Sequence, residues 1–135
     1  MGSEMCIRDS YSSICASVLS QEIAIKIMAQ SSKGKVLSRS SKMLKENLQL
    51  FQSWLDSHDG LFTFVPPKAG GMAFVGYKMD INSMELAHKL RTEQSVLIVP
   101  GDCYGMDGYL RFGIGSEAAY LSAGLDRVSE GIKSL

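Results

Sequence analysis

One arginine, Arg111, stands in the middle of a segment whose residue pattern is that of a buried strand. Side chains alternate between the two faces of a strand, so Leu110 and Phe112 point to one face while Arg111 and Gly113 point to the other. The glycine leaves space over the guanidinium group. A charge set inside a sheet needs a partner, and the planar fork of arginine binds a carboxylate through two parallel hydrogen bonds. The sequence therefore predicts that Arg111 pairs with a carboxylate.

That carboxylate could belong to a ligand or to this chain. Asp102 and Asp107 flank the loop that leads into the strand, and either could form an internal ion pair with Arg111. The open space beside the arginine instead favours a partner that arrives from outside. The residue pattern alone leaves both alternatives open.

Other residues that could carry chemistry are weaker candidates. Residues 113–115, Gly-Ile-Gly, precede a predicted helix, where backbone N–H groups can hold a phosphate, but they lack the third glycine and the Lys-Ser/Thr of a phosphate loop. His58 and His88 are expected to be solvated rather than catalytic. Cys103 is expected to be a small loop residue. Three cysteines without paired spacing and two histidines predict no metal site.

Composition limits the class of protein. Hydrophobic residues make up 45% of the chain, which is enough for the core of a globular domain. Fourteen basic residues balance fourteen acidic ones, so nothing favours nucleic acid or an anionic membrane as a partner. No apolar run approaches the roughly 20 residues that span a bilayer. The cytoplasm is the expected compartment.

The elements that must position Arg111 follow from hydrophobic periodicity and from turn residues. Gly34 is expected to separate the first two helices, Asn82 and Glu85 to form a capping box, and Ser116 to cap the last helix. The predicted helices cover residues 17–30, 35–57, 83–93 and the segment after 116, and the predicted strands cover 61–65, 72–77, 96–99 and the Arg111 segment. The expected architecture is α+β, a small sheet of about four strands with helices packed on one side.

Three segments, in this order along the chain, carry a resemblance to a known family. They are Tyr-Ser-Ser-Ile-Cys-Ala-Ser at 11–17, Pro-Pro-Lys-Ala-Gly-Gly-Met-Ala-Phe-Val at 66–75, and the Pro-Gly-x-x-Tyr-Gly loop followed by Tyr-Leu-Arg-Phe within 99–115. From about residue 11 onward the chain resembles the C-terminal small domain of class I/II (fold type I) aminotransferases, which depend on pyridoxal 5'-phosphate. The resemblance implies a parent enzyme that moves an amino group between an amino acid and a 2-oxo acid.

The resemblance also implies roles for four residues. Arg111 is expected to bind the substrate α-carboxylate, Gly70 and Gly71 to lie near the substrate entrance, and Tyr104 to lie beside the substrate pocket. For the glycines and Tyr104, turn geometry is an equally good explanation. No catalytic residue is expected in this chain, because the family places the Schiff-base lysine and the cofactor site in a large domain. The family is usually a homodimer.

These implications predict how the chain is organised. Residues 1–10 show no period and no family resemblance, and we expect a non-native or disordered leader there. Residues 11–135 are expected to form the small domain with its connecting helix, as an inactive fragment of an enzyme. One alternative is a stand-alone module that binds a carboxylate or an amino acid as a regulatory domain, without cofactor. Another is a structural domain in which Arg111 forms an internal ion pair.

Overall fold

The computed structural model describes residues 16–135, except for the side chains of residues 30 and 31. The expected leader, residues 1–10, and most of the segment at 11–17 lie outside the described residues. The chain divides into two compact units, residues 1–40 and 41–135. Each unit is described by itself.

Two helices form the described part of the first unit. Helix α2 covers Val18–Met28, and helix α3 covers Gln30–Asp56 and continues into the second unit. Ser17 caps α2, because its Oγ accepts a hydrogen bond from the backbone N–H of Ser20 at 3.2 Å. The chain leaves the helical conformation at Ala29 (φ −56°, ψ 139°). The expectation that Gly34 ends a helix is therefore wrong.

The physical reason is that a glycine weakens a helix without interrupting it. Compared with alanine it costs about 1 kcal/mol in a helix interior, but its backbone still donates and accepts the regular hydrogen bonds. Gly34 lies inside α3, with open space where a side chain would stand.

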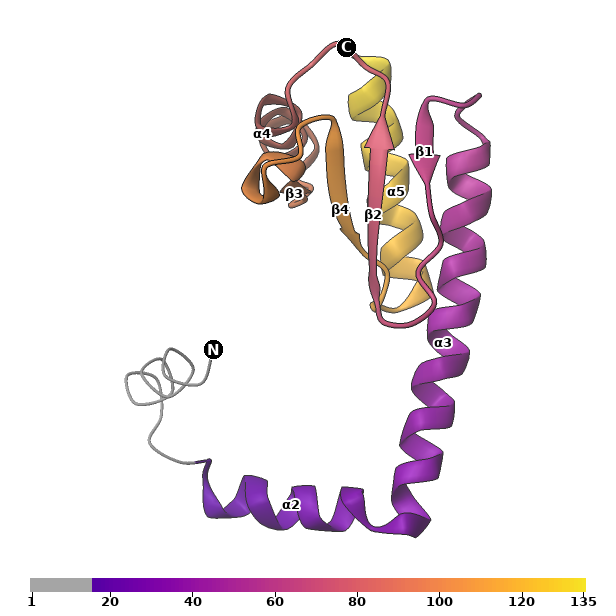
Figure 1. Ribbon diagram of the computed structural model, residues 1–135, viewed down its shortest axis with the longest axis vertical. Helices are drawn as coiled ribbons and strands as arrows, with labels where there is room; N and C mark the ends of the chain where they lie inside the picture. The colour runs from indigo at the N-terminus through magenta and orange to yellow at the C-terminus, as the bar shows by residue number, and fades with distance from the viewer. Residues whose placement is uncertain (1–15) are drawn as a thin grey trace. The chain divides into compact units, whose positions relative to one another are not determined.

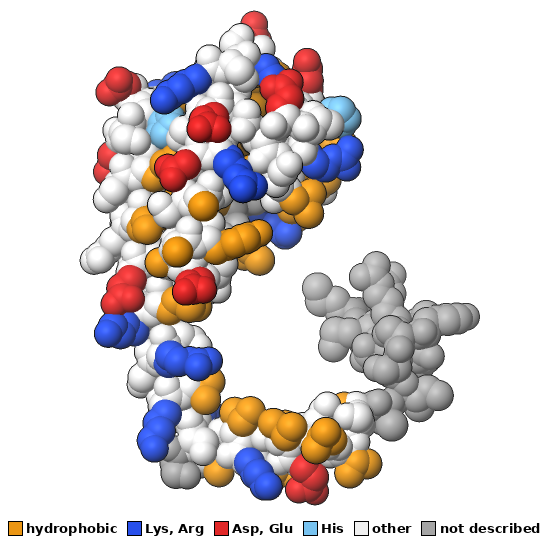
Figure 2. All heavy atoms as spheres, turned by 180° about the vertical axis from the view of Figure 1, so that it is seen from behind, with side chains coloured by type: hydrophobic (Ala, Val, Ile, Leu, Met, Phe, Trp, Pro, Cys, Tyr) orange, Lys and Arg blue, Asp and Glu red, His pale blue; other side chains and the backbone are white. Residues whose placement is uncertain are grey.

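Helix α2 carries apolar side chains that no described residue covers. None of its residues is buried, and Figure 2 shows hydrophobic side chains along much of its length. Its exposed large apolar residues are Val18, Leu19, Ile23, Ile25, Ile27 and Met28.

The second unit is built on a four-stranded antiparallel sheet in the order β1-β2-β4-β3 (Figure 1). The strands are β1 (Phe62–Phe64), β2 (Met72–Tyr77), β3 (Val99–Pro100) and β4 (Tyr109–Gly113). Four strands were predicted and four are present. The third shares only residue 99 with the predicted 96–99, because residues 96–98 line a cavity without forming a strand and Gly101 begins a 3-10 turn.

Register decides which face of the sheet is buried. Ala73 of β2 lies opposite Phe112 of β4, and Val75 lies opposite Leu110. All four side chains are buried. They pack against helices α3, α4 (Ser83–Gln94) and α5 (Ala118–Lys133). The helices contribute the buried residues Phe51, Leu55, Leu86, Ala87, Leu90, Leu121, Leu125 and Val128. The predicted α+β architecture with helices on one side is confirmed.

The starts of the last two helices differ in how they are capped. Asn82 caps α4 by accepting a hydrogen bond from the backbone N–H of Met84 at 2.9 Å. No return bond from Glu85 is found in the described part of the chain, so only half of the capping box forms.

The prediction that Ser116 caps α5 is wrong. Helix α5 begins after Glu117 and has no side-chain cap. Buried Asn47 explains this difference, because its amide donates to the carbonyls of Ile114 and Ser116 at 2.8 and 2.7 Å and holds that loop outside the helix.

Two glycines of α5 provide a matched test of this packing. A Cβ at Gly131 would lie 2.6 Å from Cδ2 of buried Leu90, whereas a Cβ at Gly124 meets nothing within 4 Å. We expect Gly124→Ala to raise the free energy of unfolding by about 0.5–1 kcal/mol through helix propensity. Gly131→Ala should lower it by about 1–3 kcal/mol through overpacking. Urea unfolding of the two variants measures both, and equal effects would contradict the close approach of α4 and α5.

Candidate functional site

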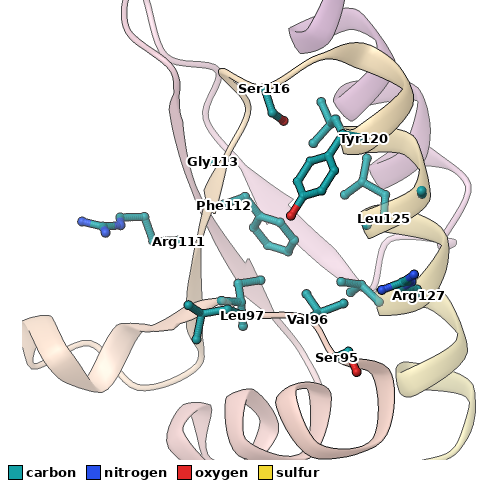
Figure 3. Close-up of a pocket in the computed structure, with 15 residues that line it drawn as sticks. Ser95, Val96, Leu97, Arg111, Phe112, Gly113, Ser116, Tyr120, Leu125 and Arg127 are labelled. Carbon is teal, nitrogen blue, oxygen red and sulfur yellow. The ribbon is translucent and has the colours of Figure 1, made fainter.

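Arg111 lies on the face of the sheet that the helices leave uncovered. It stands opposite Phe74 of β2 and Val99 of β3, and it shares this face with Tyr109 and Gly113. We call this surface the open face. Because no helix covers it, Arg111 is half-buried rather than deeply buried as the sequence suggested. Its guanidinium points away from Phe112 and from α5 (Figure 3).

The side chain of Tyr104 contacts this guanidinium. Nη1 of Arg111 donates a hydrogen bond to the hydroxyl of Tyr104, and Cζ of Arg111 lies 5.5 Å from the centre of the Tyr104 ring. The Tyr104 ring meets Phe74 edge-on at 6.0 Å, and Phe74 stacks parallel to Tyr109 at 5.1 Å. The structure therefore brings the predicted residues Arg111 and Tyr104 together, beside an aromatic pair that the sequence analysis did not single out.

The internal ion pair considered for Arg111 does not form. The Asp102 carboxylate accepts a hydrogen bond from the side-chain amide of Asn82 at 2.8 Å. Asp107 accepts from the backbone N–H groups of Ser83 and Gly108, both at 2.7 Å. Within residues 16–135, the ion pair that forms is between two other residues, Lys42 and Glu46 on α3. Both aspartates are thus engaged elsewhere, and Arg111 has no carboxylate partner among the described residues.

These aspartates instead fix the loop that carries Tyr104. The 3-10 turn η1 (Gly101–Tyr104) is tied to the start of α4, because the N–H of Asp102 donates to the hydroxyl of fully buried Ser83 at 3.0 Å. Gly101 is required within this turn, because a Cβ there would lie 2.0 Å from the carbonyl oxygen of Met106. Tyr104 is therefore presented by a turn that is fixed at its start.

The same region of the structure shifts the pKa of two ionisable groups. Hydrogen bonds from the backbone of Ser83 and Gly108 lower the pKa of Asp107. Burial raises the pKa of Tyr77 to about 12, and the negative charges of Asp107 and Asp102 add to the rise. The hydroxyl of Tyr77 donates to the carbonyl of Ile81 at 2.8 Å. Both groups stabilise the segment between β2 and α4.

The glycine pair lies in the turn immediately before β2. Gly70 has a φ of +89°, which suits glycine in the turn before β2. The carbonyl of Gly71 accepts from the N–H of Ile114 at 2.8 Å, and a Cβ at Gly71 would lie 3.3 Å from the backbone of Gly115. The positive φ explains Gly70 and close packing explains Gly71, and their place near a substrate entrance stays a prediction.

Arg111 is one of the residues that line a cavity beside β4. This cavity has a volume of about 300 Å³ and lies between residues 95–98, the end of β4 and helix α5 (Figure 3). Phe112 and Leu125 line it, with Tyr120 and Arg127 from α5. The Arg111 guanidinium points to the opposite side, so any ligand on it binds at the open face.

His58 differs from its prediction. It is half-buried rather than solvated, and its Nε2 lies 3.1 Å from the hydroxyl of Ser129 on α5. Trp54 donates to the same hydroxyl at 2.8 Å, so these residues connect α3 with α5. Only the tertiary fold brings Ser129 to them. His88 and Cys103 are exposed, as expected.

The residues present do not fit a pyridoxal phosphate site. Such a site needs a lysine amine for the Schiff base, and no lysine lines the cavity beside β4 or three other cavities of the described chain, which Gln52, Met79 and Met84 help to line. The Gly-Ile-Gly segment at 113–115 precedes Glu117, whose carboxylate at the start of α5 opposes a phosphate there. Across residues 16–135 no cluster of three potential metal ligands occurs, and no helix is long and apolar enough to cross a membrane.

Comparison with known proteins identifies the family. The family model described as "Aminotransferase class I and II" matches residues 4–128. The chain therefore belongs to the class I and II aminotransferases. Nicotianamine aminotransferase A of Hordeum vulgare is 28% identical over 115 residues, which are 80% of this chain and 24% of that protein.

Solved structures agree with this assignment. A PLP-dependent aminotransferase from Streptococcus suis 89-1591 matches with a TM-score of 0.84 and 28% identity, over 93% of this chain and 33% of that one. An aromatic aminotransferase from Pyrococcus horikoshii OT3 matches with a TM-score of 0.78 and 20% identity, over 96% of this chain and 35% of that one, and supports the fold alone. The chain thus spans between a quarter and about a third of the length of these relatives.

The lowered pKa of Asp107 predicts an acid-dependent stability. Because this carboxyl has a lower pKa in the folded chain than in the unfolded one, the unfolded chain binds more protons at acid pH. Its contribution is fully present above the unfolded pKa of about 3.9 and is lost as the pH falls through the folded value. We expect Asp107→Asn to flatten the dependence of unfolding free energy on pH below about 4. Urea unfolding between pH 2.5 and 6 measures this slope. The control is Asp126→Asn, because Asp126 is an exposed residue of α5. An unchanged slope in Asp107→Asn would refute it.

Proposed function

We propose that this chain is the C-terminal part of a longer aminotransferase, in which Arg111 binds the α-carboxylate of an amino acid or 2-oxo acid substrate. The observation that carries the proposal is the orientation of Arg111 and its lack of a carboxylate partner among the described residues. It faces the open side of the sheet, and both nearby aspartates are bound to other groups. A half-buried guanidinium without a carboxylate partner among the described residues is suited to receive a carboxylate from a ligand.

The role of Arg111 in the reaction would be positioning. Two parallel N–H···O bonds hold a carboxylate in one plane and fix the direction of the bonds at the neighbouring carbon. An interaction of this kind contributes to rate by orienting the reacting atoms rather than by exchanging protons.

The amino-group transfer itself requires the pyridoxal phosphate on which the Streptococcus suis relative depends. The residues of this chain do not provide its site, so we expect residues outside this chain to bind the cofactor, and we expect the chain alone to be inactive. We further propose that the complete enzyme is a cytoplasmic homodimer of amino acid metabolism.

Exposed apolar surface supports a longer protein. The six large apolar residues of α2 are between 43% and 75% exposed. Met72, on the open face of the second unit, is 57% exposed, and Met106, in the loop before β4, is 44% exposed. Apolar surfaces of this kind normally mark contacts with another domain or chain.

Replacement of Arg111 in the complete enzyme tests the proposal. Arg111→Lys keeps the charge but loses the two-pronged geometry. We expect kcat/KM to fall by about 10- to 150-fold, as for the loss of one charge-assisted hydrogen bond of about 1.5–3 kcal/mol. Arg127→Lys on α5 is the matched control and should retain normal kinetics. Unchanged kinetics in Arg111→Lys would exclude Arg111 as the carboxylate anchor.

The genomic DNA upstream of the Tyr11 codon tests whether the chain is part of a longer enzyme. We expect an open reading frame that continues upstream and encodes a Ser-x-x-Lys segment a few tens of residues before Tyr11. A promoter and start codon at Met1 or Met5 would instead support a stand-alone carboxylate-binding module that works without cofactor.

A further inference from the structure

We infer that the hydroxyl of Tyr104 positions the guanidinium of Arg111 and thereby selects the edge that receives the substrate carboxylate. Tyr104 is thus a positioning residue that acts through Arg111. This inference rests on the function proposed for Arg111 and adds a second residue and a binding direction to it.

The first step is that Arg111 needs external restraint. An arginine side chain on an uncovered sheet face has many rotamers, and ordering it costs roughly 1.5–2 kcal/mol of conformational entropy. Among the described residues, the one hydrogen bond made by this guanidinium goes to the Tyr104 hydroxyl, and the Tyr104 ring lies 5.5 Å from Cζ. A restraint present before binding reduces the entropy lost when the carboxylate arrives.

The second step is that Tyr104 is itself held from two directions. Its ring edge packs against Phe74, which stacks on Tyr109. Its backbone belongs to the turn that Ser83 and Asn82 tie to α4 through Asp102. Tyr104 therefore connects the guanidinium, through the fixed turn η1, to the start of α4.

The third step concerns which donors remain free. A guanidinium has five N–H donors, and the bond to Tyr104 uses one on Nη1. The edge formed by Nε and Nη2 keeps both of its parallel donors without a partner among the described residues. This edge matches the spacing of carboxylate oxygens. The substrate carboxylate would then bind side-on at Nε and Nη2.

The substitution Tyr104→Phe isolates this role. Phenylalanine keeps the ring packing against Phe74 but removes the acceptor for Arg111. The matched control is Tyr120→Phe on α5, because the side chain of Tyr120 is 76% exposed and its hydroxyl makes no hydrogen bond among the described residues.

The first measurement uses the 135-residue chain with ¹⁵N-labelled arginine. We expect NMR to show rotation about the Cζ–Nη1 bond of Arg111 at least several-fold faster in Tyr104→Phe than in the wild type, and unchanged in Tyr120→Phe. Equal rotation rates in Tyr104→Phe and wild type would overturn the inference.

The second measurement uses the complete enzyme, with propanoate and ethylamine as competitive inhibitors. They represent alanine without its amino group and alanine without its carboxylate. We expect Tyr104→Phe to weaken inhibition by propanoate about 3- to 10-fold, to raise the KM of both substrates similarly, and to leave kcat and inhibition by ethylamine nearly unchanged.

The outcomes of the two proposals are distinguishable. If Arg111→Lys is impaired while Tyr104→Phe behaves as the wild type, the positioning role fails and the function of Arg111 stands. If Arg111→Lys itself is unaffected, both fail. An equal loss of propanoate and ethylamine inhibition in Tyr104→Phe would mean general damage to the site and would also overturn the positioning role.

Discussion

The antiparallel register between β2 and β4 is the constraint on which the rest of the structure depends. It places Ala73 opposite Phe112 and Val75 opposite Leu110, so their side chains form one apolar face that three helices bury. The same alternation places Arg111 opposite Phe74 on the other face. A shift of one residue would exchange the two faces and put the guanidinium into the core without a partner. The register of β2 and β4 therefore determines both which side chains form the core and where the candidate site lies.

A second set of interactions keeps Arg111 available. Asp102 and Asp107 lie near it in sequence, and either could have neutralised it. Both are instead engaged by Asn82, Ser83 and Gly108 around the start of α4. Helix N-termini attract carboxylates, because their first N–H groups lack partners within the helix. The loop before β4 thus uses its own negative charges to fix its shape, and Arg111 remains without a carboxylate partner among the described residues.

Local patterns in the sequence predicted the features that depend on local geometry. The alternation around Arg111 predicted its face, and periodicity predicted four strands and the helices that pack on one side of them. The error at Gly34 was local, because glycine weakens a helix without ending it. The errors at Ser116 and His58 arose where a distant residue decides the outcome. Asn47, far from Ser116 in sequence, binds its carbonyl and delays the start of α5. The hydroxyl of Ser129 on α5 contacts the imidazole of His58, so His58 helps to connect α3 with α5. The hydrogen bond between Tyr104 and Arg111 likewise depends on how η1 folds back over β4, which no spacing in the sequence specifies.

The strength of the carboxylate binding that we propose for Arg111 depends on what covers the open face. In water, two unit charges 4 Å apart attract each other by only about 1 kcal/mol, and by about 4 kcal/mol at the effective dielectric typical near a protein surface. The open face of this chain leaves Arg111 half-buried, between these conditions. A second surface over Phe74, Tyr104 and Tyr109 would remove water from the guanidinium and strengthen its attraction for a carboxylate. It would also raise the free-energy cost of leaving the guanidinium without a carboxylate partner. The proposed site would bind its ligand best with the open face covered and would tolerate being empty with it uncovered, as expected if Arg111 lies on one domain of a larger enzyme.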